Sequence, residues 1–269
     1  MPTRPASLTS KKAMGQPSSP GTDPVDLRDS IEELLKFTLH SHINGTLEFD
    51  LGLSKDFCIS LLKDESSDPI TGVPESPVRS RLATALHESI VSGAFFGTYC
   101  KLDSLNNESG LKQKEQWDEL IRDKGSELKD ILKTVTFELH VQEPYFTQLK
   151  DGLKTIEGRC AVGNYNRITS GAIILFNKCL VLEVQDIHQH ASFLEMLETE
   201  SLTKVLPGVK TVEEGVKVYR KFYTEEKEKS NGVLAIFVAK LACQPYLTLA
   251  RILTGLSYAG IQNLLGRDH

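Results

Sequence analysis

The sequence predicts an α+β fold in which a small all-helical unit precedes a mixed domain of the open-barrel kind. Two observations support this fold class. Apolar residues recur at helical spacing through residues 25–133, and short runs rich in β-forming residues follow from 135 onwards. We therefore divide the chain into a disordered tail at 1–24, the helical unit at 25–133, the mixed domain at 134–241 and an apolar C-terminal helix or tail at 242–269.

Helix signals dominate the first half of the chain. The first predicted helix has a repeating face made of Leu27, Ile31, Leu34, Leu35 and Thr38. Ser54 is expected to cap a second helix, and Ser76 followed by Pro77 predicts the start of a third. A fourth helical region covers 111–133, where Gly125 is expected to divide it in two.

Strand signals dominate the second half. VTFELHV alternates between apolar and polar residues and predicts a strand, and PYFTQLKDG has the proline start and glycine end of a short helix. Two further strands, AIILFN and CLVLEVQDI, are expected to form a hairpin at Asn177-Lys178, and VLAIFVAKL closes the domain. SFLEMLETE and TVEEGVKVYRKFY have helical patterns, whereas EEKEKS is expected to be a solvated loop.

Composition excludes one broad class of function. The 269 residues are 40% apolar and 25% charged, as in soluble globular proteins, with a net charge of −5 and a pI near 5.9. This balance argues against general duplex binding, which requires a basic face. A pocket for one nucleotide needs only a few local cations, so it remains compatible with the sequence.

The cysteines and the first residues bear on the compartment. The five cysteines, Cys58, Cys100, Cys160, Cys179 and Cys243, are odd in number and contain no CxxC pair, which argues against a zinc cluster or a disulfide framework. No apolar segment of a secretory signal opens the chain. We expect a cytoplasmic or nuclear protein with reduced thiols. Organelle import stays open as an alternative, because residues 1–24 are rich in serine and poor in acids.

The C-terminal segment LTLARILTGLSYAGIQNLLG is apolar and almost long enough to span a membrane. Arg251, Gly255, Gly260 and Gln262 argue against a span, because a buried charge and polar groups are costly in a bilayer. We expect instead a helix that packs on the body of the protein or on a partner, in a monomer without membrane contact.

The stretch GLKTIEGRC places Lys154, Glu157 and Arg159 within six positions. Arginine offers a planar fork of donors for a phosphate or base edge, and a carboxylate accepts hydrogen bonds from an exocyclic amine. Lysine supplies a mobile positive charge, or a base where burial lowers its pKa. Tyr145 and Phe146, just upstream, are candidates for a stacking face. Together these residue types describe a pocket for a nucleobase or nucleotide.

With its flanks, this stretch resembles the opening of an ASCH domain, the activating signal cointegrator homology region. That family shows a strand, a Q-P-[WYF]-like turn, a short helix and then G-x-K-x-x-E-x-R. The corresponding residues are Gln142, Pro144, Tyr145, Gly152, Lys154, Glu157 and Arg159, with Glu143 interrupting the Gln-Pro pair. SGAIILFN and the segment VLPGVKTVEEGVKVYRKFYTEEKEKSNGVLAIFV continue the likeness, so that it covers 135–241, and the whole chain resembles plant members.

The resemblance implies a PUA-like barrel with a cleft between the barrel and the helices. Members of the family have been proposed to bind RNA, and some bind DNA or act in transcription coactivation. We therefore expect RNA, another single-stranded nucleic acid or a modified nucleoside to bind at Lys154, Glu157, Arg159, Tyr145 and Phe146, without a cofactor or a metal. A protein partner is expected, if at all, on the N-terminal helices or the C-terminal tail.

An enzymatic alternative comes from a bacterial branch of the family that hydrolyses the amide of N4-acetylcytidine with a Lys-Thr-Glu set. Lys154 and Glu157 would then be catalytic. Glu157 stands where that branch has its threonine, Thr155 lies next to the lysine, and Gly208 stands at the position of the acid. Nucleophilic catalysis requires the nucleophile within reach of its base, so these departures favour binding over hydrolysis. An adaptor that binds no ligand is a third hypothesis.

The same residues are also compatible with less specific interpretations. Glu157 and Arg159 lie on one face of a strand and can form a salt bridge at the barrel surface. His188 and His190 form an H-x-H pair, but a metal site needs further ligands that the sequence does not indicate. Cys160 next to Arg159 is either an activated thiol or, as we favour, an inert buried cysteine.

Overall fold

A computed structural model describes residues 25–63, 76–97 and 108–266. The tail predicted at 1–24 and most of the loop after the second helix lie outside these ranges. The helices are α1 Leu27–Ile43, α2 Lys55–Leu62, α3 Val78–Ser92, α4 Glu108–Lys133, α5 Tyr145–Lys150, α6 Phe193–Thr199, α7 Leu202–Val205, α8 Val212–Arg220, α9 Glu225–Asn231 and α10 Pro245–Leu264, with a 3₁₀ turn at Gly163–Arg167. The strands are β1 Phe137–Leu139, β2 Ile156–Cys160, β3 Ile173–Phe176, β4 Leu180–His190 and β5 Val233–Lys240.

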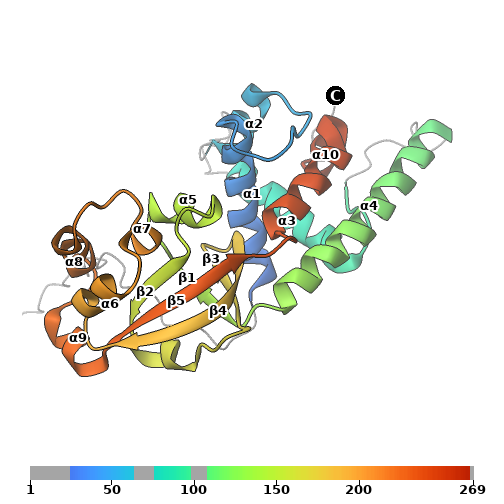
Figure 1. The fold of residues 1–269 in the computed structure, drawn as a ribbon. Helices are drawn as coiled ribbons and strands as arrows, with labels where there is room; N and C mark the ends of the chain where they lie inside the picture. Colours follow the sequence, from blue (N-terminus) through green and yellow to red (C-terminus); the bar gives the residue numbers. More distant parts are fainter. Residues whose placement is uncertain (1–24, 64–75, 98–107, 267–269) are drawn as a thin grey trace, which may run out of the picture.

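The fold is α+β, as predicted, with one curled sheet between two groups of helices. Figure 1 shows α1–α4 and α10 gathered at one end of the sheet and α6–α9 at the other. The strand order is β1-β3-β4-β5-β2, in which only the β1–β3 pair is parallel. Because the sheet curls into a half barrel, its two edge strands, β1 and β2, approach each other.

Local sequence signals explain the helix starts. The Asp26 carboxylate accepts hydrogen bonds from the N–H groups of Arg28 and Asp29 at the start of α1, and the Ser54 hydroxyl accepts one from Phe57 in α2. The cap predicted for Ser54 is therefore confirmed. The predicted start of α3 is displaced by one residue, because Pro77 itself occupies the cap position and makes no side-chain bond there.

Helix α4 is continuous across Gly125, so the predicted break at this residue is wrong. A Cβ atom at this position would lie 3.3 Å from Cγ1 of Ile90 in α3. The glycine therefore serves the close approach of two helices and does not end one. Its contact partner is distant in sequence, which is why the local pattern suggested a break.

The predicted hairpin between β3 and β4 is confirmed. Asn177 and Lys178 both have positive φ, 50° and 58°, as in the two-residue turns that match the twist of antiparallel strands. The Asn177 side chain also accepts a hydrogen bond from the Val141 N–H and donates one to its carbonyl. This amide fixes the chain after β1 against the hairpin.

The segment EEKEKS forms most of α9, so the predicted solvated loop is wrong. The Thr224 hydroxyl caps the helix by accepting from the N–H of Lys227. Glu228 is buried, accepts a hydrogen bond from the Phe193 N–H at 2.6 Å and pairs with Arg220. A buried carboxylate with partners 8 and 35 residues away has no signature in a run of alternating charges.

Helix α10 packs on the body of the protein, as predicted, and contacts α4 and α1 most extensively. Its cap residue Gln244 accepts a hydrogen bond from the Val181 N–H at 3.0 Å and donates to the Val181 carbonyl at 2.8 Å. The described part of the chain contains no helix that meets the length and apolarity needed to cross a bilayer.

The core is continuous between the helices and the sheet. One buried cluster includes Leu35 of α1, Ile90 of α3 and Leu253 of α10 together with Ile174 of β3 and Ile236 of β5. A second cluster lies beneath α6–α8 and includes Phe193, Met196 and Tyr219 with Ala235 of β5. The sheet is thus covered on both faces, and β2 lies where the second cluster meets its edge.

Replacing Gln244 with leucine is expected to lower the free energy of unfolding by about 2–4 kcal/mol. The change leaves the buried N–H and carbonyl of Val181 without side-chain partners, and each unsatisfied buried group costs about 1–3 kcal/mol. Urea unfolding followed by circular dichroism measures the effect. Gln113→Leu on the exposed face of α4 is the matched control, and an equal loss in both variants would contradict the proposed link between α10 and β4.

Candidate functional site

The charged motif lies at the seam between the two edges of the curled sheet. Lys154 precedes β2, and Glu157 and Arg159 lie on β2, where their Cα partners on β5 are Ile236 and Leu234. All three side chains are buried, with 2%, 7% and 4% of their surfaces exposed. The alternative of a salt bridge at the barrel surface is therefore excluded.

The three charges form one connected network. Glu157 accepts from Arg159 Nε through Oε1 at 2.8 Å and pairs with Lys154 Nζ through Oε2 at 3.1 Å. Lys154 also donates to the carbonyls of Ile156, at 2.8 Å, and of Val205 in α7. The network therefore anchors α7 against the edge of the sheet.

Arg159 closes the seam itself. Its Nη2 donates to the carbonyl of His140, just after β1, at 2.6 Å. Strands β1 and β2 are the two edges of the sheet. The bond therefore joins the Arg159 side chain on one edge to the backbone that follows the other edge. The guanidinium carbon also lies 6.0 Å from the ring centre of Tyr165, within the range of a cation–π contact.

The network carries one net positive charge in a buried place. Burial opposes ionisation of Glu157, but the neighbouring Lys154 and Arg159 outweigh it and hold the pKa of this carboxyl below its ordinary value. Burial also lowers the pKa of Lys154, against the pull of Glu157. The pKa of Arg159 stays raised, because Glu157 more than offsets the effect of burial on the guanidinium.

A pocket of about 340 Å³ opens over this network, a volume within the range of ~300–1,000 Å³ that is usual for small-molecule sites. Its lining comes from the chain after β1, from α5, from β2 and from α8 with the residues that follow it. These residues are His140, Val141, Gln142, Tyr145, Lys154, Glu157, Gly158, Arg159, Leu206, Val218, Tyr219, Phe222 and Tyr223.

Tyr219 lines the pocket and has a buried hydroxyl without a hydrogen-bond partner. The residue is 6% exposed, its ring stacks on Phe193 with centroids 4.1 Å apart, and its hydroxyl has no hydrogen-bond partner. Burial raises the pKa of Tyr219 well above 10, so the hydroxyl stays protonated and able to donate. The hydroxyl lies against Gly158, where a Cβ would collide with it and would come within 2.8 Å of Met196 Cε. Glycine at this position of β2 therefore admits the tyrosine.

The structure brings four of the five predicted ligand-binding residues together. Tyr145, Lys154, Glu157 and Arg159 line one pocket, and Tyr145 stays partly exposed there. Phe146 does not belong to it: the ring is 4% exposed and packs edge-on against Phe37 of α1, with centroids 5.6 Å apart. Phe146 is therefore a core residue, and we assign it no part in binding.

The sequence did not indicate the contributions of α8 and of the residues after it. Tyr219, Phe222 and Tyr223 come from a segment about 60 residues beyond the motif, for which the sequence predicted only a helix. Cys160 is buried, and burial raises its thiol pKa to about 11, so the alternative of an activated thiol is wrong. The described cysteines, Cys58, Cys160, Cys179 and Cys243, are free thiols.

Comparison with known proteins decides the family. Residues 139–242 match the family model of the ASCH domain, and this range begins at the last residue of β1 and contains the turn, the charged motif and the closing strand described above. The chain belongs to the ASCH domain family. The predicted family is thus confirmed, and the helices α1–α4 and α10 lie outside the matched residues.

Two solved structures illustrate the similarity. The crystal structure of hypothetical protein PH0355 is 48% identical, with a TM-score of 0.38, and the match covers 39% of this ASCH protein and 97% of that chain. The solution structure of protein PF0455 from Pyrococcus furiosus is 45% identical, with a TM-score of 0.36 and coverage of 39% and 97%. A search among curated proteins gave no match.

Replacing Glu157 with glutamine is expected to lower the free energy of unfolding by about 3–5 kcal/mol at neutral pH, because two buried cations then lack their counter-ion. The folded-state pKa of Glu157 lies below the unfolded value near 4.5, so its contribution is complete above that value and is lost as the pH falls further. The difference in stability between wild type and Glu157→Gln should therefore shrink below about pH 4.5.

Chemical denaturation at a series of pH values from about 3 to about 7 measures this difference, because the series spans the pKa range of carboxyl groups. Glu119→Gln, an exposed residue of α4, is the matched control and should change little. A constant difference between wild type and Glu157→Gln across the series would show that the carboxylate charge does not hold the network together.

Proposed function

We propose that the pocket over β2 binds a nucleobase or nucleotide. We propose further that this nucleotide is part of RNA or of another single-stranded nucleic acid. The observation that carries the proposal is one pocket lined both by a buried network with one net positive charge and by a tyrosine whose hydroxyl has no partner. Both features favour a ligand that brings electronegative atoms, since a buried donor without a partner and an excess charge are costly without one.

The polar groups suit the edge of a base. Each carboxylate oxygen of Glu157 is engaged by one cation, which leaves lone pairs for an exocyclic amine or ring N–H of the ligand. The Tyr219 hydroxyl is a neutral donor and suits a ring nitrogen or carbonyl oxygen. A donor and an acceptor among the residues that line one pocket can together complement an amide-like base edge.

The walls suit the face of a base. Tyr145, Phe222 and Tyr223 line the pocket, and Tyr145 remains accessible from its opening. Base–aromatic stacking is worth about 1–3 kcal/mol per base and requires an unstacked base, which single strands and loops provide. Lys154 Nζ lies 5.9 Å from the centre of the Tyr145 ring and adds a cation–π contact that holds this wall in place.

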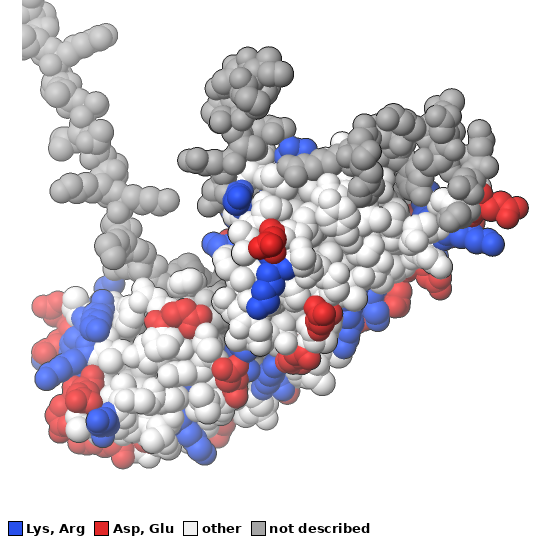
Figure 2. Space-filling model, turned by 90° about the horizontal axis from the view of Figure 1, so that it is seen from above, with Lys and Arg blue, Asp and Glu red and all other residues white. Residues whose placement is uncertain are grey.

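The surface charge favours a short or single-stranded ligand over a long duplex. Figure 2 shows acidic and basic side chains interspersed on the face that it presents, without a continuous basic track. Duplex binding relies on many phosphate contacts and therefore on such a track. A pocket that takes one or two nucleotides does not need it. We place this binding in the cytoplasm or nucleus, in keeping with the reduced cysteines.

The geometry favours binding over hydrolysis of an acylated nucleoside. A general base needs a pKa near the working pH, whereas Lys154 and Arg159 hold the pKa of Glu157 below its ordinary value. Lys154 donates to two backbone carbonyls and to Glu157, so its nitrogen is committed to the network. Gly208, which stands at the position of the acid in the hydrolytic branch, lies in a turn with φ of 91° and has no side chain.

Replacing Tyr219 with phenylalanine is expected to weaken nucleotide binding about threefold to tenfold, the equivalent of one hydrogen bond, without lowering stability. The hydroxyl has no partner within the protein, so its removal costs the fold nothing. Fluorescence anisotropy with short single-stranded RNAs measures binding, and thermal unfolding measures stability. Tyr258→Phe on α10 is the matched control. If wild type and Tyr219→Phe bind the same RNA with equal affinity, the Tyr219 hydroxyl does not contribute to the binding site.

N4-acetylcytidine offered as a substrate is expected to remain intact, because neither Glu157 nor Lys154 is poised as a base. Chromatography of the reaction mixture detects cytidine. Lys154→Met, which keeps the length of the side chain, is the control. Cytidine that forms with wild type and not with this variant would favour the hydrolase. If neither RNA nor nucleoside binds, the adaptor function, with the N-terminal helices or α10 as a surface for a protein partner, becomes the better account.

A further inference from the structure

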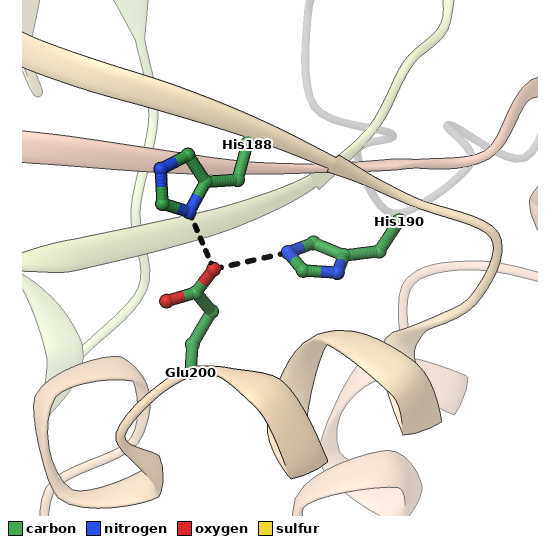
Figure 3. Close-up of side chains that lie close together, drawn as sticks. All are labelled: His188, His190 and Glu200. Carbon is green, nitrogen blue, oxygen red and sulfur yellow. Dashed lines mark hydrogen bonds and ion pairs between the residues drawn. The ribbon is translucent and has the colours of Figure 1, made fainter.

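A second cluster of side chains lies on β4, outside the pocket. His188 and His190 alternate along the strand, and Glu200 follows the last turn of α6. Figure 3 shows the two imidazole rings and the carboxylate turned toward one another. None of the three residues lines the pocket over β2, so the cluster has no part in the proposed nucleotide site.

The three groups converge closely. Glu200 Oε1 lies 2.7 Å from His188 Nδ1 and 3.1 Å from His190 Nε2, and the three potential ligand atoms all lie within 4.8 Å of one another. Ligands held about 2.0–2.1 Å from a tetrahedral metal ion are roughly 3.3 Å apart. Small rotations of these side chains therefore suffice to admit an ion between them.

A β-bulge in β4 determines which residues of the strand share a face with the cluster. The register with β5 shifts between Val184 and Asp186, so that Asp186, His188 and His190 follow one another on the same face. Asp186 Oδ2 lies 3.2 Å from Nε2 of His188, on the ring nitrogen opposite to the one that faces Glu200. A carboxylate in this place holds an N–H at Nε2 and leaves Nδ1 free for a metal, the arrangement that commonly orients metal-binding histidines.

Burial leaves the cluster open on one side. The side chains of His190 and Glu200 are 6% and 10% exposed, whereas that of His188 is 47% exposed. The His188 ring also packs against Phe237 of β5, with centroids 4.7 Å apart. Two ligands are thus fixed in the body of the domain, and the third borders solvent, from which a water molecule can complete the coordination.

We propose that His188, His190 and Glu200 form a binding site for a divalent transition metal ion, with Zn²⁺ as its most suitable occupant. Two imidazoles and one carboxylate are a donor set that zinc accepts with water as a fourth ligand. Imidazole nitrogen disfavours Mg²⁺ and Ca²⁺, which prefer oxygen. In the alternative, no ion binds between the three side chains, and Glu200 serves only as a hydrogen-bond acceptor for both rings.

Titration of the purified, chelator-treated full chain with Co²⁺ and Zn²⁺ tests this proposal. The visible absorption of Co²⁺ reports the geometry of its site, and competition with a chromophoric chelator gives the Zn²⁺ affinity. We expect one ion per chain and at least 100-fold weaker binding in His190→Ala and Glu200→Gln. Binding in Asp186→Asn should be about tenfold weaker, because the carboxylate that orients the His188 ring is lost.

His40→Ala is the matched control, since His40 is an exposed histidine on α1 whose ring contacts the Lys36 carbonyl. Binding kept in this variant and lost in the cluster variants supports the site. Glu200→Gln preserves the shape of the side chain. If its melting curve resembles that of wild type, weaker metal binding results from loss of the carboxylate and not from unfolding. Absence of stoichiometric binding to wild type, or equal binding by wild type and both cluster variants, overturns the proposal. RNA binding is measured on the same variants and is expected to be unchanged, so the two proposals fail separately.

Discussion

The burial of Lys154, Glu157 and Arg159 at the seam of the curled sheet is the constraint on which the rest of the domain depends. Three ionised groups are withdrawn from water, and such groups are tolerated only where their charges and hydrogen bonds are matched. Arg159 reaches the chain after β1, and Lys154 reaches α7, so the network ties both edges of the sheet and a covering helix to β2. These bonds hold the edges of the curled sheet together and fix α7 beside β2.

The same network explains why a pocket lies at the seam. One carboxylate does not neutralise two cations, and the excess charge faces the cavity that α5, β2 and α8 enclose. Gly158 between the charged residues allows Tyr219 to approach β2 closely, and the tyrosine hydroxyl is buried against this glycine without a partner. Stability of the seam and affinity for a polar ligand are therefore consequences of one arrangement. Variants that disturb the network will affect both properties, whereas Tyr219→Phe separates them.

Features set by neighbouring residues were predictable from the sequence, and features set by distant contacts were not. The Ser54 cap and the turn at Asn177 depend on local backbone chemistry, which the sequence shows directly. The sequence gives wrong predictions at Gly125 and Glu228 because their partners lie on other elements. Likewise, the H-x-H pair was visible on its strand, but Glu200 becomes its neighbour only through the return of α6 over the sheet. The charged motif itself was found from its spacing and from its resemblance to a family.

The central claim is that the pocket over this network is the ligand site of the domain. Backbone NMR spectra of the isotopically labelled full chain, recorded with and without a short single-stranded RNA, test it most directly. The account predicts that the amide signals of Tyr145, Gly158 and Tyr219 shift in a saturable manner, together with their neighbours around the pocket. Saturable shifts confined to α3, α4 or α10, with none at these residues, would contradict it and place the working surface on the helices.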